Sequence, residues 1–331
     1  MGSYLTTQKA FRTLLASARN GHCSQAYIFE GMKGIGKYTA ARIFANAIHC
    51  TGKNKPCGVC SDCKKHAALT HSDLMVIGQS GQIKVEDIRS MNDELYIKPA
   101  LSDKKICIVK NADNMNQDAQ NALLKSFEEP PAYAVIILLS ENVKNLLPTI
   151  RSRGNKVVFE PFSENEIKEY ILRQYPLKKD SAEFIALYSG GVIGRAKDIC
   201  ENEEFFETRK KMFESAASLA GDRLSIFAVG DVFGIKSGKS GFENCDLYFD
   251  LFTSFMRDIL ALKSGARIIN QDMAPLLEAF SSKVTLSSVL SIIERTANVR
   301  SQINVSMKYE LWIVNMLINC WEDIHGKSSR S

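Results

Sequence analysis

The chain has 331 residues, of which 45% are hydrophobic and 24% charged, and its formal net charge is +5. This composition excludes disordered and fibrous proteins, and the length exceeds the roughly 250 to 300 residues at which one hydrophobic core stops growing, so two or three domains are expected. The small net charge does not indicate a dedicated nucleic-acid binder, and with neither a secretory signal nor an apolar run of ~20 residues, we expect a cytoplasmic protein without a membrane contact.

Up to about residue 162, short β-branched runs alternate with longer helical patterns. This alternation is typical of a parallel sheet with helices on both faces. The expected strands are nearly continuously apolar, as burial on both faces requires; they cover residues 26–30, 74–77, 106–109, 135–139 and 156–159. The sequence therefore predicts an α/β, doubly wound, nucleotide-binding-like domain over residues 1–162.

A glycine-rich loop follows directly after the first expected strand. Gly31, Gly36 and Lys37 stand at the spacing G-x-x-x-x-G-K, with Gly34 between them, and an apolar helix pattern comes next. Backbone N–H groups of such a loop can close around phosphate oxygens at a helix N-terminus, while the lysine supplies a cation to the outer phosphates. The loop therefore predicts a P-loop site for ATP or ADP; an ordinary strand-to-helix turn is the less favoured alternative.

Two departures from the usual motif argue against ATP hydrolysis. A Ser or Thr hydroxyl normally follows the lysine and ligates Mg²⁺, but here Tyr38 holds that position, and Thr39 lies about 100° further round the helix. The third expected strand should end in an acidic pair, yet it runs into Lys110 and Asn111, of which the first repels the metal and the second cannot act as a general base. We therefore expect a site that can hold nucleotide without turning it over.

Four of the nine cysteines cluster between the loop helix and the second expected strand. Their spacing is C-x6-C-x2-C-x2-C, formed by Cys50, Cys57, Cys60 and Cys63. Four thiolates this close predict a structural Zn–S₄ module over residues 50–63. Reactive thiols and an iron–sulfur cluster remain the alternatives. His49, His66 and His71 lie nearby, but isolated histidines are more often surface or core residues than ligands, so we do not include them in the site.

The pattern becomes helical after the last expected strand. Ser163 followed by Glu166 predicts a capping box at the start of a small helical second domain, residues 163–201. We expect three glycines to interrupt its helices, namely Gly190, Gly191 and Gly194.

Beyond residue 202 apolar residues recur only at helical spacing, which predicts a helical bundle over residues 202–331. A second Gly-Lys-Ser string occurs at 238–240, but neither the leading glycine nor a preceding strand accompanies it. We interpret this string as a loop.

Three strings resemble the AAA+ clamp loader subunits of bacterial DNA polymerase III, in particular the delta-prime type. They are the glycine loop with its cysteine insertion, NALLKSFEEPP at 121–131, and PTIRSR at 148–153. The resemblance covers roughly residues 22–200. The C-terminal third matches only in helical character, with the Asn-Val pair at 304–305 as a weak echo of the family's collar. The resemblance implies an AAA+ fold, a small lid domain, and a collar used in oligomerisation.

The resemblance also assigns roles to two arginines. In that family a Ser-Arg-Cys motif carries an arginine that reaches the ATP site of the adjacent subunit; here the cysteine is missing, but Arg153 is present. A guanidinium suits that role because it can neutralise charge developing on the γ-phosphate. Arg195 matches the family's nucleotide sensor, although with the magnesium site damaged it could now be structural. Glu128 and Glu129 look catalytic, but the prolines that follow predict a helix end.

The favoured hypothesis is an ATPase-defective subunit of the DNA polymerase III holoenzyme. By resemblance it would dock beside the tau/gamma ATPase subunits and the delta subunit, donate Arg153 in trans, and help load the sliding clamp onto primed DNA contacted through the assembled complex. An active, tau/gamma-like ATP-hydrolysing subunit is the alternative that Tyr38, Lys110 and Asn111 disfavour. A stand-alone zinc-bearing nucleic-acid-binding protein would need a basic groove or stacking aromatics, which the sequence does not locate.

Overall fold

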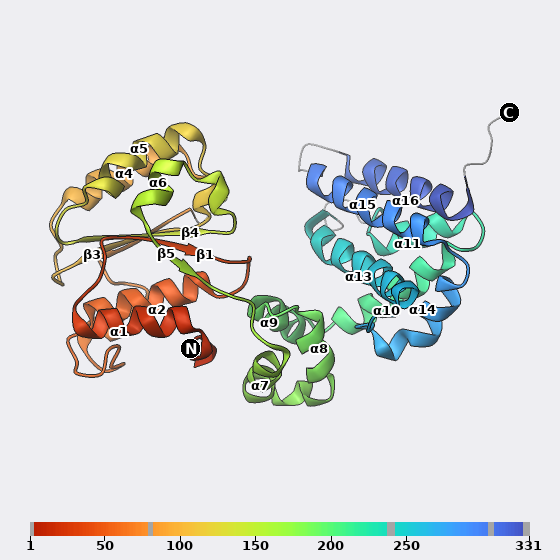
Figure 1. The fold of residues 1–331 in the computed structure, drawn as a ribbon, viewed down its shortest axis with the longest axis horizontal. Coiled ribbons are helices and arrows are strands. Elements are labelled where there is room, and N and C mark those ends of the chain that lie inside the picture. The colour runs from red at the N-terminus through yellow and green to blue at the C-terminus, as the bar shows by residue number, and fades with distance from the viewer. Residues whose placement is uncertain (1–2, 79–81, 237–241, 304–307, 327–331) are drawn as a thin grey trace. The chain divides into compact units, whose positions relative to one another are not determined.

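The computed structural model describes residues 3–78, 82–236, 242–303 and 308–326. The chain divides into two compact units, residues 1–200 and 201–331 (Figure 1). The strings at 238–240 and 304–305 lie outside the described residues. The finer division of the first unit into a nucleotide-binding part and a lid stays a prediction.

Unit 1 is built on a five-stranded parallel sheet with the strand order β2-β3-β4-β1-β5. Every residue of β3 and β4 is buried, as expected for strands covered by helices on both faces. Each predicted strand is confirmed to within one residue at either end: β1 Ala26–Glu30, β2 Leu74–Ile77, β3 Lys105–Val109, β4 Ala134–Ser140 and β5 Asn155–Val158. The expected burial of the fifth strand is wrong, because β5 lies at the edge of the sheet and three of its four residues are exposed.

Helices cover both faces of this sheet (Figure 1). On one face lie α1 (Lys9–Asn20) and α2 (Lys37–His49), and on the other lie α4 (Val85–Tyr96), α5 (Gln117–Glu128) and α6 (Pro148–Arg153). The core under the second group includes Leu123 and Phe127 of α5 packed with apolar residues of β3 and β4. Shorter elements complete the unit, namely η1 Ser3–Thr7, α3 Ser61–Ala68, η2 Ala112–Asn114 and η3 Val143–Asn145.

A group of short helices follows β5: α7 Glu164–Gln174, η4 Pro176–Ser181, α8 Ala182–Tyr188 and α9 Ile193–Glu201. The predicted capping box is confirmed, because Ser163 Oγ accepts from the Glu166 N–H at 3.3 Å and Glu166 Oε2 accepts from the Ser163 N–H at 2.8 Å. Gly194 does not interrupt a helix as expected. It is the second residue of α9, at a point where the helix approaches another backbone closely.

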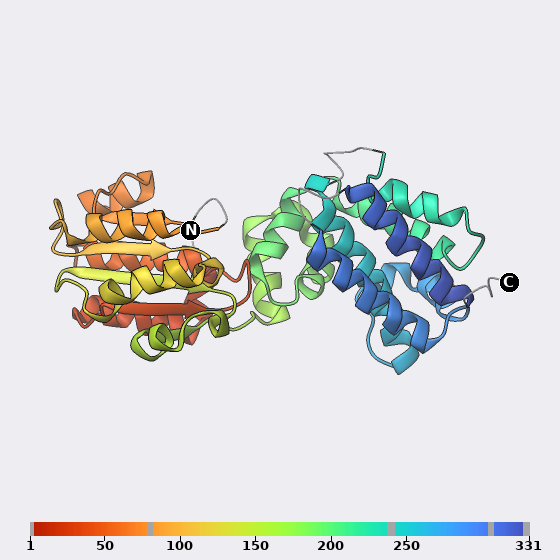
Figure 2. The same ribbon diagram turned by 90° about the horizontal axis from the view of Figure 1, so that it is seen from above.

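Unit 2 contains helices and no strand among its described residues, as predicted. The elements are α10 Phe205–Ser218, α11 Ser225–Val232, α13 Cys245–Ser264, η5 Gln271–Met273, α14 Ala274–Ser281, α15 Leu286–Gln302 and α16 Tyr309–His325. Figure 2 shows α16, in dark blue, alongside α15. Aromatic rings form much of the core: Phe255 packs edge-on against Phe213 and Phe280, with ring centroids 5.2 and 5.1 Å apart.

Within the described residues no single helix has the length and apolar character of a membrane span. The bent pair Gln271–Ser281 and Leu286–Gln302 meets those two criteria only when both helices are taken together.

Candidate functional site

The glycine loop connects β1 to α2, and its backbone geometry requires glycine. Gly34 and Gly36 have φ angles of +78° and +105°, a region that side chains with a Cβ rarely adopt. Space is restricted as well, since a Cβ on Gly36 would lie 3.2 Å from the Tyr4 hydroxyl. The loop can therefore present its backbone to a ligand closely, which is the property that the sequence predicts for a phosphate-binding loop.

Lys37 begins α2, and its side chain folds back over the loop. Its ammonium donates hydrogen bonds to the carbonyl oxygens of Gly31, at 2.5 Å, and Met32, at 2.9 Å. Only 9% of the residue is exposed. Burial lowers the pKa of Lys37, and the negative charges of Glu141 and Asp113 partly offset this effect. The lysine is thus a buried cation next to the loop.

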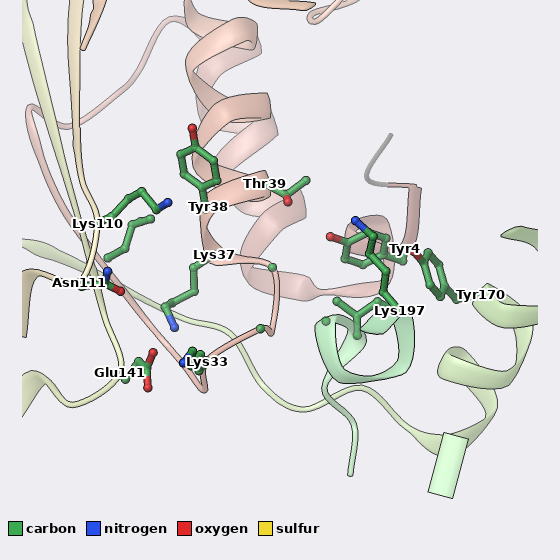
Figure 3. Close-up of a pocket in the computed structure, with 15 residues that line it drawn as sticks. Tyr4, Lys33, Lys37, Tyr38, Thr39, Lys110, Asn111, Glu141, Tyr170 and Lys197 are labelled. Carbon is green, nitrogen blue, oxygen red and sulfur yellow. The ribbon is translucent and has the colours of Figure 1, made fainter. Parts of the chain in front are cut away.

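A cavity of about 280 Å³ lies beside the loop (Figure 3). The residues that line it are Tyr4, Lys33, Gly34, Gly36, Lys37, Tyr38, Thr39, Lys110, Asn111, Leu139, Glu141, Tyr170, Ile193, Gly194 and Lys197. The structure thus brings together most of the predicted loop residues and both residues that replace the acidic pair. Gly31 and Arg195 do not line the cavity, and Arg195 is exposed.

Sequence reasoning missed the remaining side chains of the cavity wall. Tyr4 precedes the first recognisable pattern, and Tyr170 and Glu141 belong to no motif, so no signal in the sequence marked them. Lys197 lies two residues beyond Arg195, on α9, and it lines the cavity where the family resemblance placed the arginine. The roles of Arg195 and of the loop residues in nucleotide binding stay predictions.

The residues at the two expected magnesium-binding positions contact each other. The Lys110 ammonium lies 4.6 Å from the centre of the Tyr38 ring, within the range of a cation–π interaction. Thr39 lies with Tyr4 in the wall of the cavity; burial raises the pKa of the Tyr4 phenol, and the Thr39 side chain partly offsets this effect. Asn111 adopts a left-handed conformation, with φ of 51°, and its amide lies 3.5 Å from the Gly78 carbonyl oxygen.

The start of α9 seals one side of the loop. The Gly194 N–H donates to the Gly34 carbonyl oxygen at 2.9 Å. A Cβ on Gly194 would lie 2.9 Å from the Gly34 Cα, closer than real Cβ atoms approach a backbone. Two backbones therefore meet here without intervening side chains, because both positions are glycine.

Arg153 is the last residue of α6 and is 45% exposed at its side chain. Its Nη1 lies 3.2 Å from Oε1 of Glu128, at the end of α5. The predicted helix end at Glu128 is confirmed. Arg153 does not line the cavity of its own chain.

The four cysteines form a compact cluster. Cys50 directly follows α2 at its C-terminal cap, and Cys60 caps the N-terminus of α3. The sulfurs of Cys57 and Cys63 are 3.9 Å apart, as are those of Cys50 and Cys60, while a tetrahedral ion with bonds of about 2.3 Å separates its sulfurs by about 3.8 Å. The observed spacing thus fits a tetrathiolate site, and the cluster can hold a metal ion such as zinc.

Backbone donors surround these sulfurs. Cys50 Sγ accepts from the Cys57 N–H at 3.2 Å, and Cys60 Sγ accepts from the Cys63 N–H at 3.4 Å. Such hydrogen bonds lower the pKa of Cys57 and lower that of Cys60 to about 6, whereas burial raises the pKa of Cys63 to about 12. Gly52 is required by this packing, because a Cβ there would lie 2.9 Å from Cys57 Sγ.

Three buried histidines, His49, His66 and His71, meet beside the cysteine cluster. His49 Nε2 lies 2.9 Å from the carbonyl oxygen of Lys104, which can only accept, so this nitrogen carries the proton. His49 Nδ1 then accepts from His66 Nε2, also at 2.9 Å. His66 Nδ1 is left as a buried acceptor without a partner among the described residues.

The third histidine uses both ring nitrogens. His71 Nδ1 accepts from the backbone N–H of Asp73 at 3.2 Å, so Nε2 carries the proton and faces Asp62 Oδ1 at 3.5 Å. The single lone pair of His71 is used by the Asp73 N–H, so none is left to bind a metal ion. We therefore interpret the group as hydrogen-bonded neutral imidazoles rather than a three-ligand metal site. Burial lowers the pKa of His49 to about 4 and that of His66 to about 3.

Comparison with known proteins agrees with these features. Two family models match, one described as DNA polymerase III, delta subunit, over residues 6–163, and one as DNA polymerase III, delta subunit, C terminal, over residues 203–322. The delta' subunit of DNA polymerase III from Bacillus subtilis is 28% identical over 309 residues, which cover 90% of this chain and 92% of that protein.

Other relatives match over a smaller part of their length. The tau subunit of DNA polymerase III from Escherichia coli is 34% identical over 173 residues, covering 50% of this chain and 27% of that protein.

Among solved structures, a DNA polymerase III gamma subunit-related protein from Thermotoga maritima is 20% identical with a TM-score of 0.45, covering 95% of this chain and 99% of that one.

The sheet with its glycine loop after β1, the cysteine cluster and the helical second unit agree with the expected AAA+ architecture. Together the two family models cover most of both units. The chain belongs to the DNA polymerase III delta' subunit family.

Proposed function

We propose that the chain is an ATPase-defective member of the clamp loader, which docks beside tau/gamma ATPase subunits and the delta subunit and helps place the sliding clamp on primed DNA. Membership of the delta' family supports the place in the complex. The contact between Tyr38 and Lys110 carries the ATPase-defective part of the proposal, because it puts an ammonium and a phenol ring where Mg²⁺ would need oxygen ligands.

Arg153 is the residue that would act on a neighbouring subunit. Its side chain is about half exposed and lies outside the cavity of its own chain, so it is accessible to a partner. The guanidinium would neutralise charge on the γ-phosphate of nucleotide bound by that partner. The helical second unit would serve as the collar, and the protein would act in the cytoplasm.

Zinc is the metal we propose for the cysteine cluster. Four thiolates with no open ligand position are typical of structural zinc sites. When bound, the ion would supply cross-linking between the end of α2 and the start of α3, and no catalytic step. ATP or ADP would bind at the glycine loop without turnover.

Reconstitution tests the proposed function directly. The chain is mixed with tau/gamma, delta, the clamp and primed DNA, and clamp loading is measured with and without it. We expect a stable complex whose clamp loading requires this chain. An assembled loader that places the clamp on DNA equally well without the chain would contradict the proposal.

A further inference from the structure

The two residues that replace the usual magnesium-binding residues, Tyr38 and Lys110, contact each other. Tyr38 cannot ligate the metal, and Lys110 would repel it, but their side chains pack together at 4.6 Å. This contact holds a permanent positive charge at the wall of the cavity (Figure 3). A fixed ammonium can neutralise phosphate oxygens as a bound cation does, although it provides no Lewis-acid coordination for hydrolysis.

The charge of the whole cavity points to an anionic ligand. Its charged lining residues, within the described part of the chain, are four lysines and one glutamate: Lys33, Lys37, Lys110, Lys197 and Glu141. Lys37 is buried, yet the described partners of its ammonium are two backbone carbonyl oxygens and no carboxylate. Burying a cation without a directly bonded anion costs free energy. A phosphate group that entered the cavity and paired with Lys37 would offset part of that cost.

The opposite end of the cavity is aromatic. Figure 3 shows Tyr4 and Tyr170 on the other side of the loop from Lys110 and Tyr38. The two rings meet edge to face, with centroids 5.4 Å apart. Aromatic faces bind nucleobases by stacking in a sequence-tolerant way, so this end suits a base while the lysine end suits phosphates.

We propose that the cavity binds a nucleoside diphosphate as the metal-free anion, with Lys110 taking the place of Mg²⁺ and Tyr4 and Tyr170 contacting the base. The inference rests on the proposed function, in which this loop holds nucleotide without turnover. Lys37 would exchange its carbonyl contacts for the phosphates. Because the cation is part of the chain, binding would not require divalent metal.

Calorimetry with the full, metal-loaded chain tests the inference, with ADP and inorganic pyrophosphate as probes. Magnesium-free buffer is prepared by treatment with a cation-exchange resin, so that no chelator reaches the cysteine cluster. We expect ADP to bind in this buffer, and to bind no more tightly when Mg²⁺ is added, since Mg²⁺ competes with Lys110 for the same phosphates. Absence of ADP binding without metal, or binding that appears only with Mg²⁺, would overturn the inference.

Matched variants separate the two ends of the cavity. Lys110→Ala should weaken both probes about tenfold or more, the factor typical of one charge-assisted hydrogen bond, whereas Lys125→Ala, an exposed lysine of α5 outside the cavity, should change neither. Tyr170→Ala should weaken ADP and leave pyrophosphate unchanged. Equal effects of the Lys110 and Lys125 substitutions, or an equal loss of both probes in the Tyr170 variant, would contradict the assignment.

A combined Tyr38→Thr and Lys110→Asp variant restores the usual metal-binding residue types. Its ADP binding should become dependent on Mg²⁺. ADP binding that remains independent of Mg²⁺ would argue against the role given to Lys110.

Clamp loading by the wild-type complex is measured separately. A chain that assembles and loads clamps but binds no ADP overturns this inference and the nucleotide binding proposed with it, but leaves the proposed place in the clamp loader standing. A chain that binds ADP but does not assemble overturns that place in the clamp loader and leaves this inference standing.

Discussion

The guanidinium of Arg153 is paired with Glu128 of the same chain, with Nη1 3.2 Å from Oε1. Both side chains are partly exposed, and ion pairs of this kind contribute only about 0 to 1 kcal/mol. A neighbour's triphosphate carries more charge than one carboxylate and could draw the arginine away at small cost. The pair therefore orients Arg153 without preventing its proposed role in trans.

Replacing Arg153 should reduce the ATP hydrolysis of a neighbouring subunit. Arginine fingers contribute about 10³ to 10⁵ in rate in well-studied GTPases, but only one of several loader sites would be affected, so we expect a partial loss from the reconstituted complex carrying Arg153→Ala. DNA- and clamp-stimulated hydrolysis is the measurement, after gel filtration has shown intact assembly. Arg151→Ala, an exposed arginine of the same helix, is the control. Wild-type hydrolysis in the Arg153 variant would leave this residue an ordinary surface arginine.

The isolated chain should hydrolyse ATP at less than about 0.01 per second, at least a hundredfold below the 1 to 100 per second typical of kinases. The physical reason is that neither Tyr38 nor Lys110 can ligate Mg²⁺. Steady-state phosphate release from protein freed of other ATPases is the measurement. Turnover within the kinase range that survives repurification would favour the active tau/gamma-like alternative.

Purified protein should contain one zinc ion per chain, and Cys60→Ser should release it. Because metal binding and folding are coupled at structural sites, even ~2 kcal/mol of lost stability lowers the melting temperature by about 4–8 °C in a unit of this size. Elemental analysis and thermal unfolding are the two measurements. Cys245→Ser, which changes a thiol of α13 outside the cluster, should keep both metal and stability. Retained zinc in the Cys60 variant would rule out the site.

The buried histidines should make the protein sensitive to mild acid. The pKa of His49 is about 4 and that of His66 about 3 in the folded chain, against about 6.5 when unfolded. The unfolded state therefore binds more protons below pH 6.5, so their contribution to stability is present above that pH and is lost as the pH falls towards 4. Each of the two histidines should lower the free energy of unfolding by roughly 2 kcal/mol as the pH falls from 6.5 to 5.

Urea unfolding at pH 7 and 5 checks this dependence, in the metal-free Cys60→Ser background so that acid release of zinc does not contribute. Adding His66→Gln should make the loss of stability between the two pH values smaller. An identical loss with and without His66 would show that other groups cause the acid sensitivity.

Much of the first unit could be predicted from the sequence, because buried parallel strands and a glycine loop leave strong local patterns. The five strands and the capping box of Ser163 and Glu166 have this origin. Contacts between distant segments could not be predicted. Tyr4 lies in the cavity wall only because η1 packs against the loop. The pairing of Tyr38 with Lys110 arises because α2 begins where β3 ends, at the same edge of the sheet.

The histidine group shows the same limit in another way. Each histidine taken singly gives no signal, and the sequence separates His49 from His71 by the whole cysteine insertion. Folding of that insertion brings the three rings together, with centroids 4.3 to 5.0 Å apart. Only the three-dimensional arrangement also fixes which nitrogen carries each proton, and this decides against a metal site.

The contact between Gly34 and Gly194 constrains how this sequence can evolve. The two positions are 160 residues apart in the chain, yet neither can gain a methyl group without displacing the backbone or side chain opposite. A mutation at one position cannot be tolerated by a simple change at the other, because no smaller residue exists. Divergent descendants that keep the glycine loop pressed against α9 should therefore retain both glycines, and lineages that lose one should be free to lose the second.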